Sequence, residues 1–480
     1  MTTVSPVELR SRAVDVLCDP ALAEVVDLVA WQEGDAVLVA NADGSARLTA
    51  AGTEVLAGRD PVADQDPLAF SSLAEELADR SPPNARNSYP DAHARLASLF
   101  AADAAPDLAV VHTGRHYWPD QGGHDGEHGS LSVVQSRAPL LLSGAGVTER
   151  GVLQASARVV DIGPTLAWLA GVPLSALGGL DGRVLVDVLV PDSRHVVGLL
   201  WDGCNSNSLY ALARAGELPN VARLLARGCA FSGGAIAEFP SVTLVNHTSA
   251  LTGVGPGRHG IVNNAYFDRG AAAQRLTNDA RTWHRWAEWL APGVQTVFER
   301  VDAPTACVNE PADSGADYST FDLVRGGGSR DGAASMDDML PDPRKDPHAT
   351  RDYVEARKDY AWSSSVDAIG LEQMLSLWPS AREAPRLTWW NTLLTDTGHH
   401  AGGPHSAIAH AAMRDADNRL GVFLDHAERI GALDEMTIVL TSDHGSEGAD
   451  PTCVGDWDEP LRDAGITFRD EAYGFLYLNC

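Results

Sequence analysis

An apolar run, HVVGLLWDG (195–203), stops abruptly at Asp202 and Gly203 and is the clearest indication of the architecture. Runs of this kind are typical of strands buried on both faces of a parallel sheet, although a buried helix segment is an alternative for each of them. Helix-like segments follow four similar runs: DLAVVHTG (107–114), APLLLSG (138–144), RLTWWNTLLTD (386–396) and MTIVLTSDHG (436–445). The alternation predicts an α/β fold with a central, mostly parallel sheet flanked by helices.

Two longer segments have the pattern of helices, and two regions fit neither class. The helix candidates are SNSLYALARAGELPNVARLLARG (206–228) and SAIAHAAMRDADNRLGVFLDHAERIG (406–431), and the first serine of the second is a suitable N-cap. Residues 13–57 predict a small N-terminal β meander with turns at EGD and NADG. Residues 303–360 are rich in Gly, Asp, Pro and Ser, so we expect an inserted cap at about 260–385.

The chain has 480 residues and a formal net charge of −29. This charge argues against nucleic-acid polymers and anionic membranes as partners, because both repel an acidic surface. The six cysteines are scattered without a CxxC spacing, which is typical of free thiols in a reducing compartment. The first residues lack the basic and apolar regions of a signal peptide, and no stretch reaches the roughly 18 apolar residues of a membrane span. We therefore expect a cytoplasmic protein, whose oligomeric state the sequence does not predict.

Carboxylates and imidazoles, the side chains that zinc and similar ions prefer, stand at the ends of three apolar runs. They are Asp202, Asp396, Asp443 and His444, with His400 four residues beyond Asp396. Open α/β sheets bind ligands at the carboxyl ends of their strands, so we expect these side chains to converge. Taken singly, each is more often a cap or turn residue. Their recurrence at three strand ends predicts a metal site.

Several segments of the same part of the chain resemble a known family. They are LLWDGCNSNSLY, LPNVARLLARG, FPSVTLVNHTSALTGVGPGRHGIVNN, DTGHHAGGPHS and VLTSDHG. In content and order they resemble the nucleotide pyrophosphatase/phosphodiesterase branch of the alkaline phosphatase superfamily, over nearly all of 195–450. The resemblance implies an alkaline-phosphatase-like fold and two Zn2+ ions, with other divalent metals such as Mn2+ as alternatives.

The resemblance also implies roles for individual residues. The ligands of the first zinc would be Asp202, Asp443 and His444. Those of the second would include Asp396 and His400. Thr243 would lie against the metals as the nucleophile. An ordinary turn or helix N-cap is the alternative for this threonine.

The family needs one more histidine for the second zinc, normally after the SDHG segment, and this chain has none after His444. The stretch GGHDGEHGSLSVVQSRAPLLLSGAGV, followed by VVDIGPTLAWLAGVP, resembles the usual C-terminal part of the superfamily and offers His128. We therefore expect a circular permutation, in which 1–190 corresponds to the usual C-terminal part, 195–480 to the usual N-terminal part, and both form one catalytic domain. His124 and His116 are nearby alternatives, as is a histidine-rich loop without a metal role.

A metal-bound threonine hydroxyl is a far better nucleophile than a free one, because the metal stabilises its alkoxide. We expect Thr243 to attack phosphorus, Asn246 to donate its amide to a phosphoryl oxygen, and water to hydrolyse the phosphothreonine. Asn264, Tyr266 and Trp283 are candidate substrate contacts, with simple packing as the alternative for each.

The expected activity is that of a metal-dependent phosphodiesterase or nucleotide pyrophosphatase acting on a small-molecule phosphate ester, diester or monoester. A phosphonoacetate-hydrolase-like enzyme that cleaves a C–P bond is the alternative, because the DGC and HGIVNN segments also resemble that group. A non-catalytic metal-binding interaction protein is a third.

Overall fold

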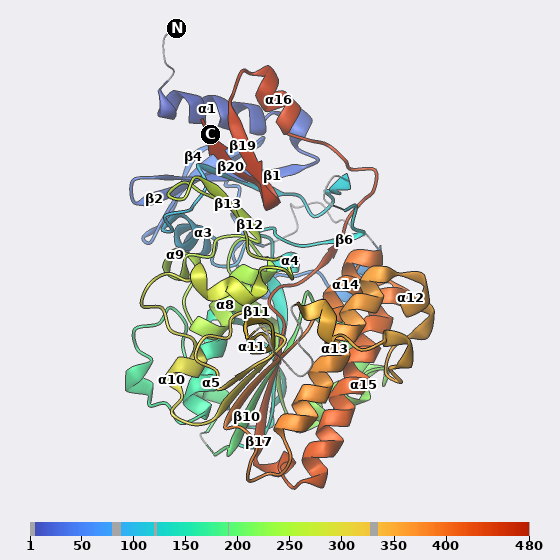
Figure 1. Cartoon of the computed structure of the whole chain (residues 1–480). Coiled ribbons are helices and arrows are strands. Elements are labelled where there is room, and N and C mark those ends of the chain that lie inside the picture. The colour runs from blue at the N-terminus through green and yellow to red at the C-terminus, as the bar shows by residue number, and fades with distance from the viewer. Residues whose placement is uncertain (1–4, 79–87, 120–121, 191, 327–334, 480) are drawn as a thin grey trace.

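The computed structural model describes residues 5–78, 88–119, 122–190, 192–326 and 335–479, and its centre is a nine-stranded sheet (Figure 1). The strands follow in the order β15 (Tyr318–Ser319), β14 (Thr305–Val308), β16 (Leu387–Thr392), β10 (His195–Trp201), β17 (Met436–Thr441), β7 (Arg137–Gly144), β11 (Gly228–Ile236) and β8 (Gly151–Leu153), with β9 (Ala157–Arg158) also paired to β11. From β15 to β17 every pair is parallel, whereas β7 is antiparallel to both of its neighbours. The predicted α/β fold with a mostly parallel sheet is confirmed.

The central sheet is buried on both faces because alternate residues of each strand enter different cores. In β7, Leu140 and Leu142 belong to one core and Leu141 to the other. The first core is closed by α5 (Ile162–Leu169), α8 (Thr243–Thr252) and α10 (Val297–Arg300). The second is closed by α6 (Ser206–Arg214), α7 (Pro219–Ala226), α13 (Lys358–Leu377) and α15 (Ala407–Arg429). Figure 1 shows the two helical layers on opposite sides of the sheet.

The helix predicted over 206–228 is two helices, because Gly216 adopts φ +80° and Pro219 starts the second one. The helix predicted over 406–431 is α15, and Ser406 caps it by accepting a hydrogen bond from the backbone N–H of Ala409 at 3.2 Å. Its neighbour α14 (Leu394–Gly402) follows β16 and lies near the carboxyl ends of the parallel strands.

A second, seven-stranded antiparallel sheet lies at the top of Figure 1. Its order is β19 (Phe468–Glu471), β20 (Phe475–Leu478), β5 (Leu108–His112), β1 (Val26–Glu33), β2 (Ala36–Asn41), β3 (Gly44–Thr49) and β4 (Gly52–Gly58). The predicted meander is β1 to β4. The run 107–114, predicted for the parallel sheet, is β5 of this sheet instead. An antiparallel strand can also be apolar throughout when both faces are covered, here by α1 (Pro6–Leu17) and α3 (Ala92–Phe100).

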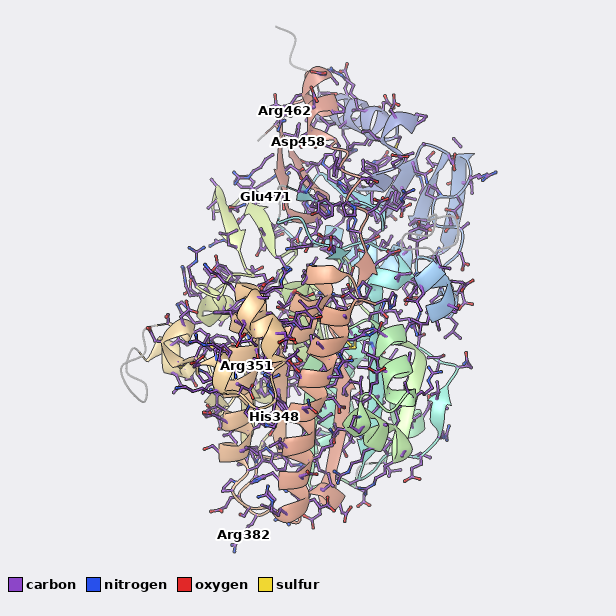
Figure 2. All side chains as sticks on the ribbon, turned by 90° about the vertical axis from the view of Figure 1, so that its right-hand side faces the viewer. His348, Arg351, Arg382, Asp458, Arg462 and Glu471 are labelled. Atoms are coloured by element: carbon purple, nitrogen blue, oxygen red, sulfur yellow. The ribbon has the colours of Figure 1, made fainter. Side chains whose placement is uncertain are left out.

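The span 260–385, predicted as an inserted cap, is only partly separate from the central sheet. Its β14 and β15 extend the edge of that sheet, and α13 packs on one face. The outer part includes the hairpin of β12 (Ala265–Asp268) and β13 (Ala273–Leu276), η7 (Trp283–Glu288) and α12 (Arg351–Ala356). Figure 2 looks onto the helical layer on this side, where His348 and Arg351 are labelled. The four-residue strand β14 was hidden by its Gly- and Asp-rich surroundings, and 327–334 lies outside the described residues.

The first and last described segments pack together. Leu9 and Leu17 of α1 share a core with Leu476 of β20. Met1 and Cys480, whose proximity the permutation predicts, lie outside the described residues, so the permutation stays a prediction. The five described cysteines are all free thiols. Within the described ranges, no helix is both long enough and apolar enough to cross a membrane.

Candidate metal centre

The carboxyl ends of three parallel strands bring the first group of predicted ligands together. Asp202 follows β10, and Asp443 and His444 follow β17, and all three are buried. The Nε2 atom of His444 lies 3.0 Å from Asp443 Oδ2 and 3.9 Å from Asp202 Oδ1. Gly203, at φ +62°, packs so closely against Asp396 that no side chain fits there. The glycine of the DG pair therefore allows two carboxylates from different strands to approach each other.

The second predicted group consists of Asp396, His400 and His128, whose ligand atoms lie within 4.8 Å of one another. Asp396 and His400 stand one turn apart on α14, and His400 Nε2 is 3.3 Å from Asp396 Oδ2. His128 comes from the loop after β6 (Gly126–Glu127), hundreds of residues earlier, and its ring stacks on His444 at 3.8 Å between centroids. The structure thus brings six of the seven predicted metal-site residues, all except Thr243, into one cluster.

Three imidazoles are oriented in the same way. The Nδ1 atom of each lies against a backbone carbonyl oxygen: His128 against Ser241 at 3.0 Å, His400 against Gly126 at 2.7 Å and His444 against Gly445 at 2.8 Å. A proton on Nδ1 satisfies that carbonyl and leaves the Nε2 lone pair directed at the carboxylates. Histidine ligands of metals are usually held in this tautomer by such a bond.

The electrostatics of the cluster favour a bound cation. Burial, together with the neighbouring carboxylates of Asp443 and Asp396, raises the pKa of Asp202 well above its ordinary value. Burial and the adjacent His444 and His400 lower the pKa of His128, which keeps its imidazole in the neutral form that binds metals.

Two carboxylate oxygens of the cluster, Asp202 Oδ1 and Asp396 Oδ1, are buried without a hydrogen-bond partner among the described residues. Buried polar atoms are normally paired, and leaving them unpaired is costly. The donor set of oxygens and imidazole nitrogens is one that zinc and manganese accept. The residues present therefore fit divalent metals.

Thr243 is the first residue of α8, and Val242 before it has the extended conformation of an N-cap. Its hydroxyl has no hydrogen-bond partner among the described residues, so it does not act as an ordinary cap. The next backbone N–H, that of Leu244, donates to Asn264 Oδ1 at 3.0 Å. This bond fixes the amide of Asn264 beside the start of α8, and within the described chain its Nδ2 group has no other partner.

Asn246 does not have the orientation that we predicted. Its Oδ1 accepts the backbone N–H of Glu238 at 2.7 Å, and its Nδ2 lies 3.0 Å from the carbonyl of Val242 and 3.2 Å from that of Pro240. The side chain is completely buried. The amide thus holds the loop that precedes Thr243, and none of its hydrogen-bonding groups remains for a phosphoryl oxygen.

The other two predicted substrate contacts differ in their surroundings. Tyr266 is 3% exposed and belongs to the core of the antiparallel sheet, so its surroundings are those of a packing residue. Trp283 donates to Asn278 Oδ1 at 3.1 Å and packs against Phe321 and Trp362 in the outer region. No contact of the described residues joins Trp283 to the ligand cluster, and its role stays a prediction.

Two residues outside the predicted set also join the cluster. The Nε2 atom of His247 lies 3.7 Å from Asp202 Oδ2 and 3.5 Å from Asp443 Oδ2, while its Nδ1 lies 2.9 Å from Glu310 Oε2. His247 stands four residues after Thr243 on α8, so the helical spacing could have revealed it. Glu310 follows the short strand β14, and no sequence pattern around it indicated a place in the cluster.

The two alternatives to His128 lie in different places. His116 packs against Trp118 and Trp457, and its Nε2 lies 2.9 Å from the carbonyl of Gly455, so it is not a member of the cluster. The His124 ring lies 4.1 Å from that of His400, and with Glu127 and His400 it forms another group of three metal-binding side chains. His124 therefore remains an alternative.

A family model described as "Type I phosphodiesterase / nucleotide pyrophosphatase" matches residues 196–480. Among solved structures, an inactive form of murine ectonucleotide pyrophosphatase/phosphodiesterase 5 in complex with AMP is 16% identical, with a TM-score of 0.38, and the match covers 58% of this chain and 64% of that one. Phosphonoacetate hydrolase from Sinorhizobium meliloti 1021 in complex with phosphonoformate is 22% identical, with a TM-score of 0.36 and coverage of 55% and 59%. This chain therefore spans less than two thirds of the length of either relative.

Proposed function

The chain belongs to the type I phosphodiesterase/nucleotide pyrophosphatase family, and we propose that it hydrolyses small-molecule phosphodiesters, or phosphomonoesters, through a phosphothreonine on Thr243. The observation that supports this function best is the cluster of buried carboxylate and imidazole ligand atoms, which His247, one turn after Thr243 on α8, also joins. The single experiment that tests it is the hydrolysis of a chromogenic phosphodiester with and without a chelator.

We assign the ligand cluster to two divalent metals, with zinc as the first choice and manganese as an alternative. One set would be Asp202, Asp443, His444 and Thr243. The other would be Asp396, His400 and His128. When bound, the metals lower the pKa of a coordinated hydroxyl and stabilise negative charge on the phosphoryl oxygens.

The Thr243 oxygen is the nucleophile of the first step. It forms a bond to phosphorus while the bond from phosphorus to the leaving oxygen breaks, and the threonine proton passes to the leaving group, which departs as an alcohol or a phosphate. In the second step the oxygen of a water molecule bonds to phosphorus, the Thr243–phosphorus bond breaks, and the threonine recovers its proton. Atoms and charge balance as in ester hydrolysis, with one water consumed in each cycle.

Asn264 takes the role that we first expected of Asn246. Its Oδ1 is fixed by the N–H of Leu244, and its unpaired Nδ2 can donate to a phosphoryl oxygen attached to Thr243. The positive end of the α8 dipole stabilises the same charge. Asn246 contributes indirectly, because its side-chain amide bonds to the backbone of Glu238 and Val242 and so fixes the loop that precedes Thr243.

The assay compares bis(p-nitrophenyl) phosphate, a p-nitrophenyl ester of a nucleoside monophosphate, p-nitrophenyl phosphate and phosphonoacetate as substrates of the zinc-loaded protein. Ester turnover that a chelator abolishes and zinc restores supports the proposal. Preferential release of phosphate from phosphonoacetate would favour the C–P hydrolase instead. Stoichiometric metal without turnover of any of these compounds would favour a binding protein.

We also propose that residues 1–190 and 195–480 form one catalytic domain in permuted order, in a cytoplasmic protein. Two observations support the first part: β7 lies inside the central sheet, and His128 lies beside Asp396 and His400. The free thiols support the second part.

A further inference from the structure

One side chain of the antiparallel sheet reaches the metal centre. The hydroxyl of Tyr473 lies 3.3 Å from His128 Nε2, and the two ring centroids are 5.3 Å apart. Tyr473 stands in the tight turn between β19 and β20, near the end of the chain. His128 is its hydrogen-bond partner among the described residues. A residue of the second sheet therefore touches the atom that would bind a metal.

The turn that contains Tyr473 is held in an unfavourable conformation. Tyr473 has φ +56° and ψ 40°, a left-handed conformation that a bulky residue rarely adopts. Gly129, at φ +107°, lies so close to the tyrosine ring that a side chain at that position would collide with it. Strain of this kind persists only where the surrounding structure enforces it, and it is frequent at functional sites.

Contacts from another hairpin enforce this conformation. The side-chain amide of Asn263 donates to the carbonyl of Ala472 at 2.6 Å, and that of Gln274 donates to Glu471 at 2.5 Å. Figure 2 shows the labelled Glu471 where β19 lies beside the β12–β13 hairpin. Asn263 also precedes Asn264, which holds the start of α8. Two adjacent residues before the hairpin, Asn263 and Asn264, thus contact the turn of Tyr473 and the start of α8.

The hydrogen bond of Tyr473 in this structure uses the electron pair that a metal needs. Because His128 Nδ1 is committed to the carbonyl of Ser241, its Nε2 is the acceptor of the tyrosine proton. A metal on Nε2 would take that electron pair, so the hydroxyl would lose its acceptor. A phenol is protonated at neutral pH, and it would then need another acceptor beside the metal. Anionic oxygens bound at the centre supply one.

We propose that Tyr473 is a substrate-binding residue whose hydroxyl donates a hydrogen bond to a phosphoryl oxygen of the bound ester or phosphate. The ligand class is a tetrahedral oxyanion, either as a phosphate ester or as free phosphate. This inference rests on the proposed function, because it needs a phosphoryl group at the metal centre. Through Tyr473, the antiparallel sheet would contribute directly to substrate binding.

The test replaces Tyr473 by Phe, which keeps the ring and removes the hydroxyl. The matched control is Tyr477→Phe in the next strand, because the Tyr477 hydroxyl donates to the carbonyl of Ala104 at 2.9 Å and not to the cluster. For zinc-loaded proteins we would measure metal content by mass spectrometry, thermal stability, the Kd of inorganic phosphate by calorimetry, and kcat/KM for bis(p-nitrophenyl) phosphate.

We expect Tyr473→Phe to keep both metals, to bind phosphate about 10-fold to 100-fold more weakly and to lose a similar factor in kcat/KM, as for the loss of one hydrogen bond to a charged group. Tyr477→Phe should keep the wild-type Kd and kcat/KM. Unchanged phosphate affinity in Tyr473→Phe would overturn the inference. Loss of one metal would also overturn it, since Tyr473 would then only support His128.

The two proposals fail in different ways. A wild-type protein that binds phosphate through its metals but hydrolyses no ester contradicts the proposed function, while the effect of Tyr473→Phe on phosphate affinity still decides the inference. A metal-loaded wild-type protein that neither binds phosphate nor hydrolyses any ester overturns both.

Discussion

The nine-stranded and the seven-stranded sheets are both covered on two faces, but they contribute to the metal centre in different ways. A proposed ligand lies beyond the carboxyl end of each of the parallel strands β10, β16 and β17, namely Asp202, Asp396 and Asp443. The antiparallel sheet contributes through the segments that follow or join its strands. His128 lies in the segment after β5, and Tyr473 lies in the turn between β19 and β20. In the proposed site, the parallel strands therefore position the carboxylate ligands, and the antiparallel sheet adds Tyr473 beside them.

The same difference explains what the sequence could predict. Apolar runs such as 195–203 and 436–445 predicted strands and ligands together, because both signals are local. The pairing of β20 with β5, in which Phe475 lies opposite Ala109, joins segments that are far apart in the chain and have no common pattern. Tyr473 had no sequence signal for this reason. Asn246 and Asn264 were both singled out, but only three-dimensional hydrogen bonds could assign their roles.

The substitution with the largest expected effect, Thr243→Ala, removes the proposed nucleophile at the start of α8. We expect turnover of a phosphodiester to fall by roughly 10⁴-fold or more, because no other nucleophile replaces the hydroxyl. Metal content should stay close to wild type, since the remaining ligands are intact. The control is Thr252→Ala on the same helix, whose hydroxyl donates to the carbonyl of Thr248 at 2.6 Å. Turnover near that of the wild type in Thr243→Ala would remove the nucleophile assignment.

His128→Ala tests whether the segment beyond the antiparallel sheet completes the site. We expect the loss of about one metal per chain and of most activity, because two remaining ligands are too few for a catalytic site that normally has three. His116→Ala is the control, since His116 packs against Trp118 and Trp457. The metal content and the phosphodiester turnover of each variant are the quantities to measure. Greater metal loss in His124→Ala than in His128→Ala would assign the third ligand to His124.

Substitution of the two asparagines distinguishes a residue that would bind the phosphoryl group from one that stabilises the fold. Asn264→Ala should lower kcat by roughly 10²–10³-fold, the typical effect of removing one preorganised donor. Asn246→Ala should mainly destabilise the fold, by about 1–3 kcal/mol, because it leaves the buried N–H of Glu238 without an acceptor. Steady-state kinetics and urea unfolding of both variants make the comparison. A larger fall in kcat for Asn246→Ala than for Asn264→Ala would return the catalytic role to Asn246.

The last prediction concerns stability alone, with no expected change in the catalytic rate. Asp367 on α13 is completely buried and accepts hydrogen bonds from the backbone N–H groups of Leu393 and Leu394, at 2.8 and 3.3 Å, where α14 begins. Burial raises its pKa to about 6. The unfolded carboxyl has a pKa of about 3.9, so the folded protein binds this proton at higher pH than the unfolded chain. The resulting stabilisation is complete below about pH 4 and is lost as the pH rises through about 6.

Asp367→Asn removes this titration but keeps an oxygen that can accept the N–H of Leu393. Relative to wild type, the variant should therefore gain stability as the pH rises from about 4 to about 7, by up to about 3 kcal/mol, which corresponds to two pKa units. Urea unfolding of both metal-loaded proteins at several pH values measures this difference, in which the titration of the metal ligands cancels. Asp425→Asn, at a side chain that is 71% exposed, is the matched control and should show no such trend. A stability difference between wild type and Asp367→Asn that does not change with pH would show that Asp367 does not titrate in this range. In either case the catalytic rate at neutral pH should hardly change, because Asp367 contacts the backbone at the start of α14 and none of the proposed ligands.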